Sequence, residues 1–534
     1  MPSQTNESPD RFLRRRPLRV WPALLITLLA AARATQIWLF RDYDVQFKVE
    51  GTHGLLRHWV VGMAIWWLLF SRIRWQSRLK GVVVLGLVAG LISLFVRVHG
   101  IDGNRIPILE WRWSSRASSA ASVPRGSSSN PNGIESATRP VGNSPAVRPE
   151  ASFPQFLGPS RNGILPGPAL FEDWTKRPPE LIWRQPVGEG WSGFAVQGSD
   201  AVSLEQDGDN EVIVCRELTT GNVRWRQAYP ARYDNPSAGT GPRTVASIEG
   251  DFIWTTGATG MLTCTDRRDG RVVWQHNCLK DANAAVPEWG FSGSPLIHGN
   301  WVIVPSGGVN GKSLTAYDKR SGAIVWSSGN DVTGYSSPVL VTLGGTRQIL
   351  SFSHAGITGY SASDGRQLWW RATAQIPNVA VPLAVDDSHV LISSGYGFGA
   401  ELLEVKPNAA GVWSASQTWR SIRMKSKFAN LILREGHAYG FDDGTFACIR
   451  LSDGSKAWKD GRYGHGQVLQ VGNLLLATTE SGEIVLIDPS PEGLRERTRF
   501  RVLTGKTWNP PALAGDLLLV RHDREAACFR LPIQ

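Results

Sequence analysis

Cysteine and methionine are scarce in this chain of 534 residues, which has five cysteines and four methionines. No two cysteines are adjacent, and none forms a CxxC or CxxCH motif, so a zinc ribbon, a c-type haem and a thioredoxin-like redox centre have no support. Four cysteines fall at one equivalent position of a repeat described below. They are therefore expected to be buried small apolar residues, too far apart to bond. They are Cys215, Cys264, Cys448 and Cys528.

Tryptophan and glycine are abundant instead, with 23 and 56 residues. Many glycine turns and many aromatic side chains favour an all-β repeat protein over a helical one. The net charge of +11 is weak evidence for nucleic acid as a partner, because much of the excess lies in N-terminal arginines that membrane topology explains. The length predicts at least two structural regions.

Three apolar stretches lie within the first hundred residues, at Val20–Phe40, Leu55–Phe70 and Gly81–Val98. A helix of roughly 20 residues spans the hydrocarbon core of a bilayer. The first and third stretches fit this length, although Arg33 lies inside the first and must snorkel or face a partner helix. The second is short and carries Arg57 beside a histidine. The sequence therefore predicts two or three transmembrane helices.

Basic residues cluster before the first stretch and between the second and third. They are Arg11, Arg14, Arg15, Arg16 and Arg19, then Arg72, Arg74, Arg78 and Lys80. The positive-inside rule then places both clusters in the cytoplasm and everything after Val98 outside. If the second stretch only lies on the surface, the remainder would be cytoplasmic. A cleaved signal peptide, with a faint cleavage site at Ala32–Ala34, is the alternative for the first stretch and leaves the outside placement unchanged.

Four regions follow from this pattern. A cytoplasmic basic N-terminus covers residues 1–19, and a membrane anchor covers 20–98. Residues 99–152 form a flexible linker, since the stretch from 114 is rich in Ser, Pro, Ala, Gly and Asn and lacks apolar periodicity. A repeat domain covers residues 153–534.

The repeat consists of an apolar strand, a tight turn with a glycine, and a short strand that ends in tryptophan. The clearest copies are CRELTTGNVRW ending at Trp225, CTDRRDGRVVW at Trp274, AYDKRSGAIVW at Trp326, GYSASDGRQLW at Trp369 and CIRLSDGSKAW at Trp458. Weaker copies contain Trp183 and Trp419 or end at Phe500. The spacing of 39 to 52 residues matches one four-stranded propeller blade per copy.

The two ends of the repeat domain predict how the ring closes. LIWRQP, around Trp183, is an outer strand without a blade, and the segment from PPALAGD to EAACFRLPI supplies three strands without a fourth. Together they complete one blade, which leaves no exposed sheet edge. The predicted fold class is all-β, an eight-bladed β-propeller with an N-terminal α-helical transmembrane anchor.

The signature AYDKRSGAIVW resembles the tryptophan-docking repeat of quinoprotein dehydrogenases and of BamB-like outer-membrane assembly scaffolds. The resemblance covers about residues 153–534, and the lead-in FPQFLGPSRNGILPG (153–167) resembles the segment that precedes such repeats in bacterial PQQ-binding-like proteins. It implies a propeller of the pyrroloquinoline-quinone (PQQ) repeat type, in a group often built as a membrane anchor plus propeller. It does not imply an activity, because a fold does not determine function.

A quinone site would need more than the repeat. The resemblance implies adjacent cysteines joined as a disulfide, a calcium or lanthanide ion held by Glu, Asn and Asp, and an Asp as base. No two cysteines are adjacent here, so no catalytic, cofactor-binding or metal residue is predicted and no cofactor is required. PQQ with Ca²⁺ is the alternative. The acidic segments Asp207–Asn210 and Asp442–Gly444 are expected to be hairpin turns rather than calcium sites.

The loops that enter the inner strands should converge on one mouth of the central channel. Their aromatic, cationic and amide residues are the candidate ligand-binding residues: Trp191, Arg243, Trp289, Tyr335, Lys425, Arg462, His465, Trp508 and Asn509. Aromatic walls with a few cations suit an anionic or sugar-like ligand or an acidic peptide. Tryptophans at such positions are more often packing residues of a propeller, and the arginines could equally bind buried carbonyls. His465 could be a structural histidine, since the sequence places no carboxylate beside it.

These observations favour a non-catalytic binding or assembly scaffold, tethered to the cytoplasmic membrane as a multi-pass protein with the propeller on the periplasmic or extracellular side. Its expected partners are the membrane and either a protein or a small anionic or sugar-like ligand, with no nucleic acid. The alternative is a PQQ-dependent oxidoreductase of the alcohol dehydrogenase type. A third hypothesis is a sensor that signals through the helices, for which the sequence offers no cytoplasmic output domain.

Overall fold

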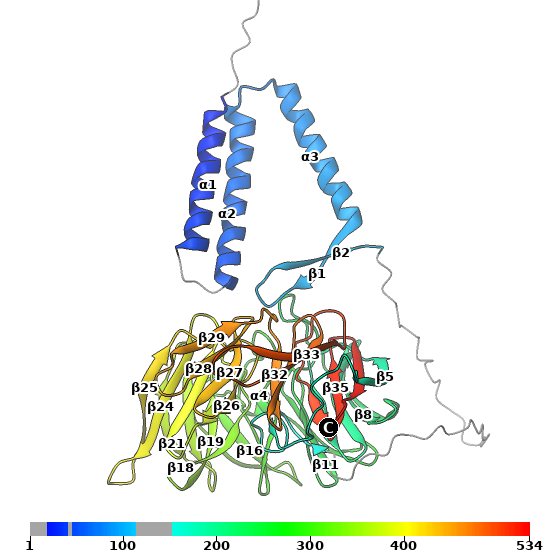
Figure 1. Cartoon of the computed structure of the whole chain (residues 1–534), viewed down its shortest axis with the longest axis vertical. Coiled ribbons are helices and arrows are strands. Elements are labelled where there is room, and N and C mark those ends of the chain that lie inside the picture. The colour runs from blue at the N-terminus through cyan, green and yellow to red at the C-terminus, as the bar shows by residue number, and fades with distance from the viewer. Residues whose placement is uncertain (1–18, 41–44, 114–151) are drawn as a thin grey trace, which may run out of the picture. The chain divides into compact units, whose positions relative to one another are not determined.

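A computed structural model describes residues 19–40, 45–113 and 152–534 (Figure 1). The chain divides into two compact units, Met1–Ser115 and Arg116–Gln534. The basic residues Arg11, Arg14, Arg15 and Arg16, and the linker residues 114–151, lie outside the described residues.

The first unit contains three long helices followed by a β-hairpin. Its elements are α1 (Trp21–Leu39), α2 (Val45–Ile65) with a π-helical continuation η1 (Trp66–Phe70), α3 (Trp75–Phe95), β1 (Val96–Ile101) and β2 (Pro107–Trp111). By length and composition, α1 and α3 could each cross a membrane. Two indole N–H groups hold α1 against α2, where Trp38 donates to Thr52 (2.9 Å) and Trp59 to Thr27 (3.2 Å).

The helix boundaries differ from the apolar stretches of the sequence. The second helix begins at Val45, ten residues before Leu55. The third ends at Phe95, and the residues up to Ile101 form a strand, where the sequence predicts the end of a span and the start of a linker. Apolar composition alone could not separate this strand from the helix before it.

The second unit consists of eight sheets, one per predicted blade, numbered here as blades 1 to 8. Blade 1 contains β3 (Ser152–Phe153), β6 (Ala195–Gln197), β7 (Asp200–Asp207), β8 (Asn210–Glu217) and β9 (Val223–Pro230). Blade 2 contains β10 (Ser247–Glu249), β11 (Phe252–Thr256), β12 (Met261–Asp266) and β13 (Val272–Asn277), followed by the short helix α4 (Cys278–Asp281). Blade 3 contains β14 (Leu296–His298), β15 (Trp301–Val304), β16 (Leu314–Asp318) and β17 (Ile324–Ser328). Blade 4 contains β18 (Val339–Leu343), β19 (Thr346–Phe352), β20 (Gly356–Ser361) and β21 (Gln367–Ala372).

The remaining four sheets follow the same order. Blade 5 contains β22 (Leu383–Ala384), β23 (His389–Ser394), β24 (Gly399–Pro407) and β25 (Trp413–Ser421). Blade 6 contains β26 (Ile432–Arg434), β27 (His437–Asp442), β28 (Thr445–Arg450) and β29 (Lys456–Asp460). Blade 7 contains β30 (Gln467–Val471), β31 (Leu474–Thr478), β32 (Glu483–Asp488) and β33 (Arg495–Arg501), with β4 (Ile164–Leu165) beside β30. Blade 8 contains β34 (Ala512–Ala514), β35 (Leu517–Arg521), β36 (Glu525–Arg530) and β5 (Glu180–Pro186).

The ring closes in blade 8 as the sequence predicts. Strand β5 pairs antiparallel with β36, so that Cys528 faces Trp183 and Phe529 faces Leu181. In Figure 1, β5 lies beside the red strands of the C-terminal end. The fold is therefore an all-β, eight-bladed propeller, and its first and last strands share one sheet.

Most tryptophans of the repeat join their blade to the next one, whereas the Trp369 indole N–H donates to Gln348 of its own blade. The ring of Trp225 in blade 1 packs on Gly270 of the blade 2 turn, and its Nε1–H donates to Arg267 O at 2.9 Å. Trp183 and Trp419 repeat this arrangement, with Nε1–H donating to Leu218 O and Leu451 O, each at 2.8 Å. In every outer strand a bulge comes directly before the docking position, and in blade 7 the residue at this position is Thr498. Phe500, expected at this place from the sequence, lies two residues later.

The five cysteines are free and buried. Four of them face the docking tryptophans directly across the outer strand pair: Cys215 and Trp225, Cys264 and Trp274, Cys448 and Trp458, Cys528 and Trp183. The prediction of unbonded, buried cysteines at one repeat position is therefore confirmed. Burial raises the pKa of the Cys215 thiol to about 12, which keeps it protonated and unreactive.

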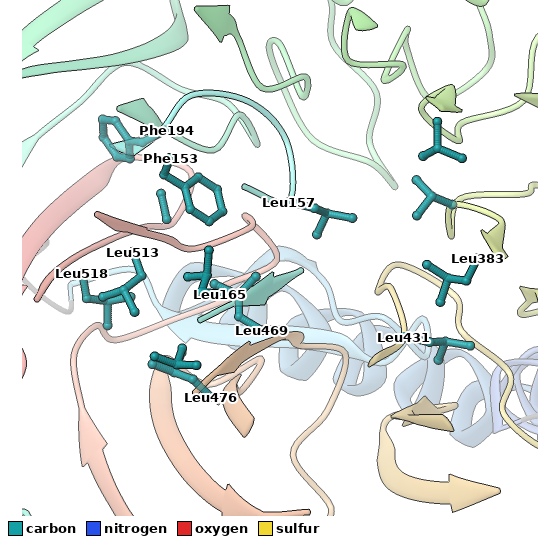
Figure 2. Packing of buried hydrophobic residues seen from close by; sticks show 14 of the residues in the cluster. Phe153, Leu157, Leu165, Phe194, Leu383, Leu431, Leu469, Leu476, Leu513 and Leu518 are labelled. Carbon is teal, nitrogen blue, oxygen red and sulfur yellow. The ribbon is translucent and has the colours of Figure 1, made fainter. Parts of the chain in front are cut away.

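The lead-in segment 152–170 crosses one end of the ring. It pairs with inner strand β6 through β3, and Arg161 donates to Ser294 O (3.1 Å) and Pro295 O (2.9 Å) at the start of β14. It then pairs parallel with inner strand β30 through β4. Leu157 lies in the same buried apolar cluster as Leu383 and Leu431 of blades 5 and 6 (Figure 2). The segment thus joins inner strands of several blades.

Candidate functional site: the channel mouth

The opposite end of the ring, here called the mouth, is built by two kinds of loop. One kind leads from the outer strand of a blade to the inner strand of the next, and the other joins the second and third strands within a blade. The lead-in binds the far end of the inner strands, since β3 pairs with Val196 and Gln197, the last residues of β6. The mouth is therefore the end at which the predicted binding residues meet.

Three aromatic rings from different blades stack beside a lysine on one side of the mouth. The ring of Trp508 lies 5.2 Å from that of Trp191 and 4.9 Å from that of Phe428. The Lys506 ammonium lies 4.1 Å from the Trp508 ring and 4.8 Å from the Trp191 ring, within the range of a cation–π interaction. This group, with His465 beside Phe428 at 5.2 Å, is here called the Trp508 cluster.

Glu480 organises the Trp508 cluster. Its carboxylate accepts a hydrogen bond from Trp508 Nε1 at 2.8 Å and another from the backbone N–H of His465 at 3.0 Å. A carboxylate therefore does lie beside His465, contrary to the expectation from the sequence. The His465 side chain is buried, and burial together with Lys427 lowers its pKa to about 4, although Glu480 opposes the shift. The imidazole is neutral at neutral pH.

A second aromatic group faces the first from blades 3 to 5 and is here called the Trp289 cluster. The ring of Trp289 stacks on Tyr335 at 5.3 Å and lies 5.9 Å from Tyr396. The backbone N–H of Trp289 donates to the Tyr335 hydroxyl oxygen at 3.3 Å. The buried Lys427 connects the clusters, because its ammonium lies 5.2 Å from the Tyr396 ring and 5.5 Å from the Phe428 ring.

Arg243 and Asn509 hold backbone groups in place. The Arg243 guanidinium donates to Ala238 O (3.1 Å) and Gly239 O (2.9 Å), and burial lowers its pKa to about 10. Asn509 is buried, and its Nδ2 donates to Gly190 O (3.3 Å) and Ser192 O (2.9 Å), which ties the loop before blade 8 to the loop before blade 1. For these two residues the geometry favours the structural alternative.

Lys425 and Arg462 lie outside both clusters. The Lys425 ammonium lies 3.8 Å from the Asp442 carboxylate, whose other oxygen pairs with Lys459 at 3.0 Å. Arg462 is exposed, and among the described residues it forms neither a hydrogen bond nor an ion pair. Of the nine predicted residues, the structure brings five together in the two clusters: Trp191, His465 and Trp508, and Trp289 and Tyr335.

The sequence did not single out five residues that build this mouth: Tyr396, Lys427, Phe428, Glu480 and Lys506. Lys427, Phe428 and Lys506 lie in two loops that enter inner strands, RMKSKFAN and KTWNPP. Their place at the mouth could therefore have been predicted from the sequence. Tyr396 and Glu480 come from turns between second and third strands. Those turns reach the mouth as well, which strand patterns alone do not reveal.

The described residues show neither the adjacent cysteines of a quinone–calcium centre nor a cluster of ionisable side chains for its metal ion. No group of three or more His, Cys, Asp or Glu side chains in residues 19–40, 45–113 and 152–534 is arranged to hold a metal ion. The two acidic turns are engaged by basic side chains, since Asp207 pairs with Arg226 at 2.8 Å and Asp442 with Lys459. The disulfide of adjacent cysteines that the resemblance implies cannot form in this sequence.

Comparison with known proteins agrees with the repeat. Residues 208–460 match the family model described as "Outer membrane protein assembly factor BamB". Over these residues the propeller is similar to the BamB-like PQQ repeat. No curated protein matches the sequence significantly.

Two solved structures that are similar to this chain have low sequence identity to it. Quinohemoprotein alcohol dehydrogenase from Comamonas testosteroni is 12% identical over 72% of this chain and 81% of its own, with a TM-score of 0.52. BamB from Moraxella catarrhalis is 15% identical over 65% of this chain and 86% of its own, with a TM-score of 0.35. At this identity the dehydrogenase likeness concerns the fold alone.

Proposed function

We propose that this propeller is a non-catalytic binding scaffold, tethered to the cytoplasmic membrane, whose channel mouth binds an acidic segment of a partner protein. The observation that carries the proposal is the mouth itself. There, Lys427 and Lys506 lie against the faces of aromatic rings contributed by several blades. Strands β3 and β4 of the lead-in pair with the other end of inner strands β6 and β30, so the mouth is the side from which a ligand would reach these residues.

The chemistry of the mouth suits carboxylates on an extended chain. An ammonium beside indole rings offers a charge-assisted hydrogen bond to a carboxylate. The exposed parts of the rings offer flat apolar surface for the methylene groups next to that carboxylate. Glu480 is held by Trp508 and by the His465 backbone, which directs its charge toward these donors.

A tether in the membrane is the second part of the proposal. Helices α1 and α3 are candidates to cross it, and Arg72, Arg74 and Lys80 lie exposed around the start of α3. The positive-inside rule then favours a cytoplasmic location for this end of α3 and an outside location for its other end. The propeller follows that other end in the chain and would lie in the periplasm or outside the cell.

A PQQ-dependent dehydrogenase shares the fold, but no observation at the mouth favours it. Among the described residues, no group of three or more His, Cys, Asp or Glu side chains is arranged to hold a metal ion. The activity of the similar alcohol dehydrogenase therefore suggests a substrate class for that protein only.

The test is an isothermal titration of the full-length chain in detergent with a hexaglutamate peptide, repeated with Lys506→Gln. We expect saturable binding to the wild type and a loss of affinity of roughly five- to tenfold in the variant, about 1 kcal/mol for one charge-assisted contact. The matched control is Lys456→Gln, because this exposed lysine lies on outer strand β29, away from both clusters.

Binding should also weaken as salt is added and should be absent for a hexaglutamine peptide. Equal affinity of the wild type and Lys506→Gln for hexaglutamate would place the binding surface elsewhere. No binding of either peptide would remove the acidic partner from the proposal.

A further inference from the structure

We infer that the hairpin β1–β2 lies flat in the lipid interface of the membrane that α3 enters, with one apolar face against lipid. This inference rests on the proposed transmembrane role of α3 and is independent of any ligand at the mouth. It assigns to residues 96–111 a membrane-contacting role where the sequence indicates only a linker.

The hairpin is continuous with α3 and fastened to its last turn. Strand β1 begins at Val96, the residue after the helix end at Phe95. On the returning strand side, the Arg112 N–H donates to Phe95 O at 2.7 Å, and the Trp113 ring packs edge-on against the Phe95 ring at 4.7 Å. Helix α3 has 21 residues, a length of roughly 31 Å that matches the hydrocarbon core. Both ends of the hairpin therefore lie where the chain leaves the bilayer.

One face of the hairpin is apolar and uncovered. Val96 pairs with Trp111, and Val98 with Leu109, so these four side chains share a face. Val98 is 63% exposed, Leu109 65% and Trp111 63%. Such a face is costly in water and marks a contact surface. Trp113, 66% exposed, and Ile106, 46% exposed, extend it at the two ends.

The remaining groups of the hairpin indicate that lipid is the occupant. Tryptophan is enriched at the level of lipid headgroups because its ring is amphipathic, and Trp111 and Trp113 occur together here. Arg97, Arg105 and Arg112 provide cations in the same segment, which suits the phosphates of anionic headgroups.

The hairpin is also held in a fixed orientation. The Asp102 carboxylate accepts hydrogen bonds from the N–H groups of Asn104 (2.9 Å) and Ile106 (2.8 Å), which fixes the turn. Arg105 pairs with Glu50 of α2 at 2.8 Å. Glu50 stands near the start of α2 and Arg105 follows the end of α3, so both lie at one end of the helices, as a three-helix anchor requires.

The test places an environment-sensitive dye at single engineered cysteines of the full-length chain in phosphatidylcholine–phosphatidylglycerol vesicles. The positions are Val98→Cys and Leu109→Cys, and the five native cysteines are buried, so they provide little background. The lipids carry a nitroxide quencher either near the headgroup or near the bilayer centre. Two matched exposed valines are the controls: Val88→Cys within α3 and Val412→Cys on the propeller.

We expect dye at positions 98 and 109 to be quenched at least about twofold more by the shallow nitroxide than by the deep one, as an interfacial depth requires. Dye at position 88 should show the reverse order, and dye at position 412 should not be quenched. A blue-shifted but unquenched dye at 98 and 109 would mean that protein covers this face, which overturns the inference. Quenching at 88 without quenching at 98 and 109 would also overturn it, and absence of quenching at 88 would show that α3 itself does not span.

Discussion

At the scale of single residues, the interface between two blades depends on a glycine beneath a tryptophan. Gly270 has a φ of 75°, and a Cβ at this position would lie 2.3 Å from the ring of Trp225. The turn therefore excludes side chains both through its backbone conformation and through the ring above it. The positive φ is a requirement local to each turn, so the glycine could be read from every copy of the repeat, whereas the ring above it comes from the preceding copy.

Gly270→Ala should destabilise the propeller more than Gly250→Ala. Gly250 also has a positive φ, 60°, but nothing lies within 4 Å of its added Cβ. We expect about 1 kcal/mol for the backbone strain in Gly250→Ala and a further 1–3 kcal/mol, roughly, for displacement of Trp225 in Gly270→Ala. Chemical unfolding followed by tryptophan fluorescence measures both, and equal losses would contradict the docking role.

His465 should make stability depend on pH. Burial is the main cause that lowers the pKa of His465 in the folded protein to about 4, whereas its ordinary pKa is near 6.5. Between pH 4 and 6.5 the imidazole therefore binds a proton in the unfolded chain but not in the folded protein. The stability that the neutral His465 contributes is fully present above pH 6.5. It is lost as the pH falls toward 4, at up to about 1.4 kcal/mol of unfolding free energy per pH unit. Unfolding free energies of the wild type should therefore rise more steeply between pH 4 and 6.5 than those of His465→Gln. Parallel profiles would contradict a buried, neutral His465.

At the scale of elements, the signature strands followed from the sequence while the lead-in did not. Middle strands such as β7 and β8 are buried almost throughout because blades pack on both of their faces, and outer strands such as β9 alternate. The lead-in has only the two-residue strands β3 and β4. It contacts residues far along the chain, for example where Gly472 N–H donates to Leu165 O at 2.9 Å. No periodic pattern records such contacts.

Leu157→Ala tests the lead-in as an element of the core. Leu157 is 4% exposed within the main apolar cluster, so its truncation should cost about 2–5 kcal/mol. Leu181→Ala is the matched control, because Leu181 is 49% exposed on outer strand β5 and should cost less than about 0.5 kcal/mol. Similar small losses in both variants would mean that the lead-in does not stabilise the ring.

At the scale of the whole molecule, the ring closure and the blade count could be predicted because the outer strand β5 comes at the start of the repeat domain, whereas the other three strands of its blade come at the end. The mouth could be predicted only in part. The loops that enter the inner strands were identifiable, and five of the nine predicted residues meet there. Lys427 and Glu480 both act on His465 because blades 6 and 7 lie side by side in the ring. Which residues lie next to them depends on the three-dimensional course of the turns, which strand patterns do not give.

We propose that the PQQ-like repeat serves here as the frame of a binding mouth and not of a quinone site. The most direct test titrates the full-length chain with pyrroloquinoline quinone and Ca²⁺, following cofactor absorbance and tryptophan fluorescence, with hexaglutamate titrated in parallel. We expect a saturable fluorescence change with the peptide and none with the quinone. Saturable, calcium-dependent binding of the quinone would contradict it.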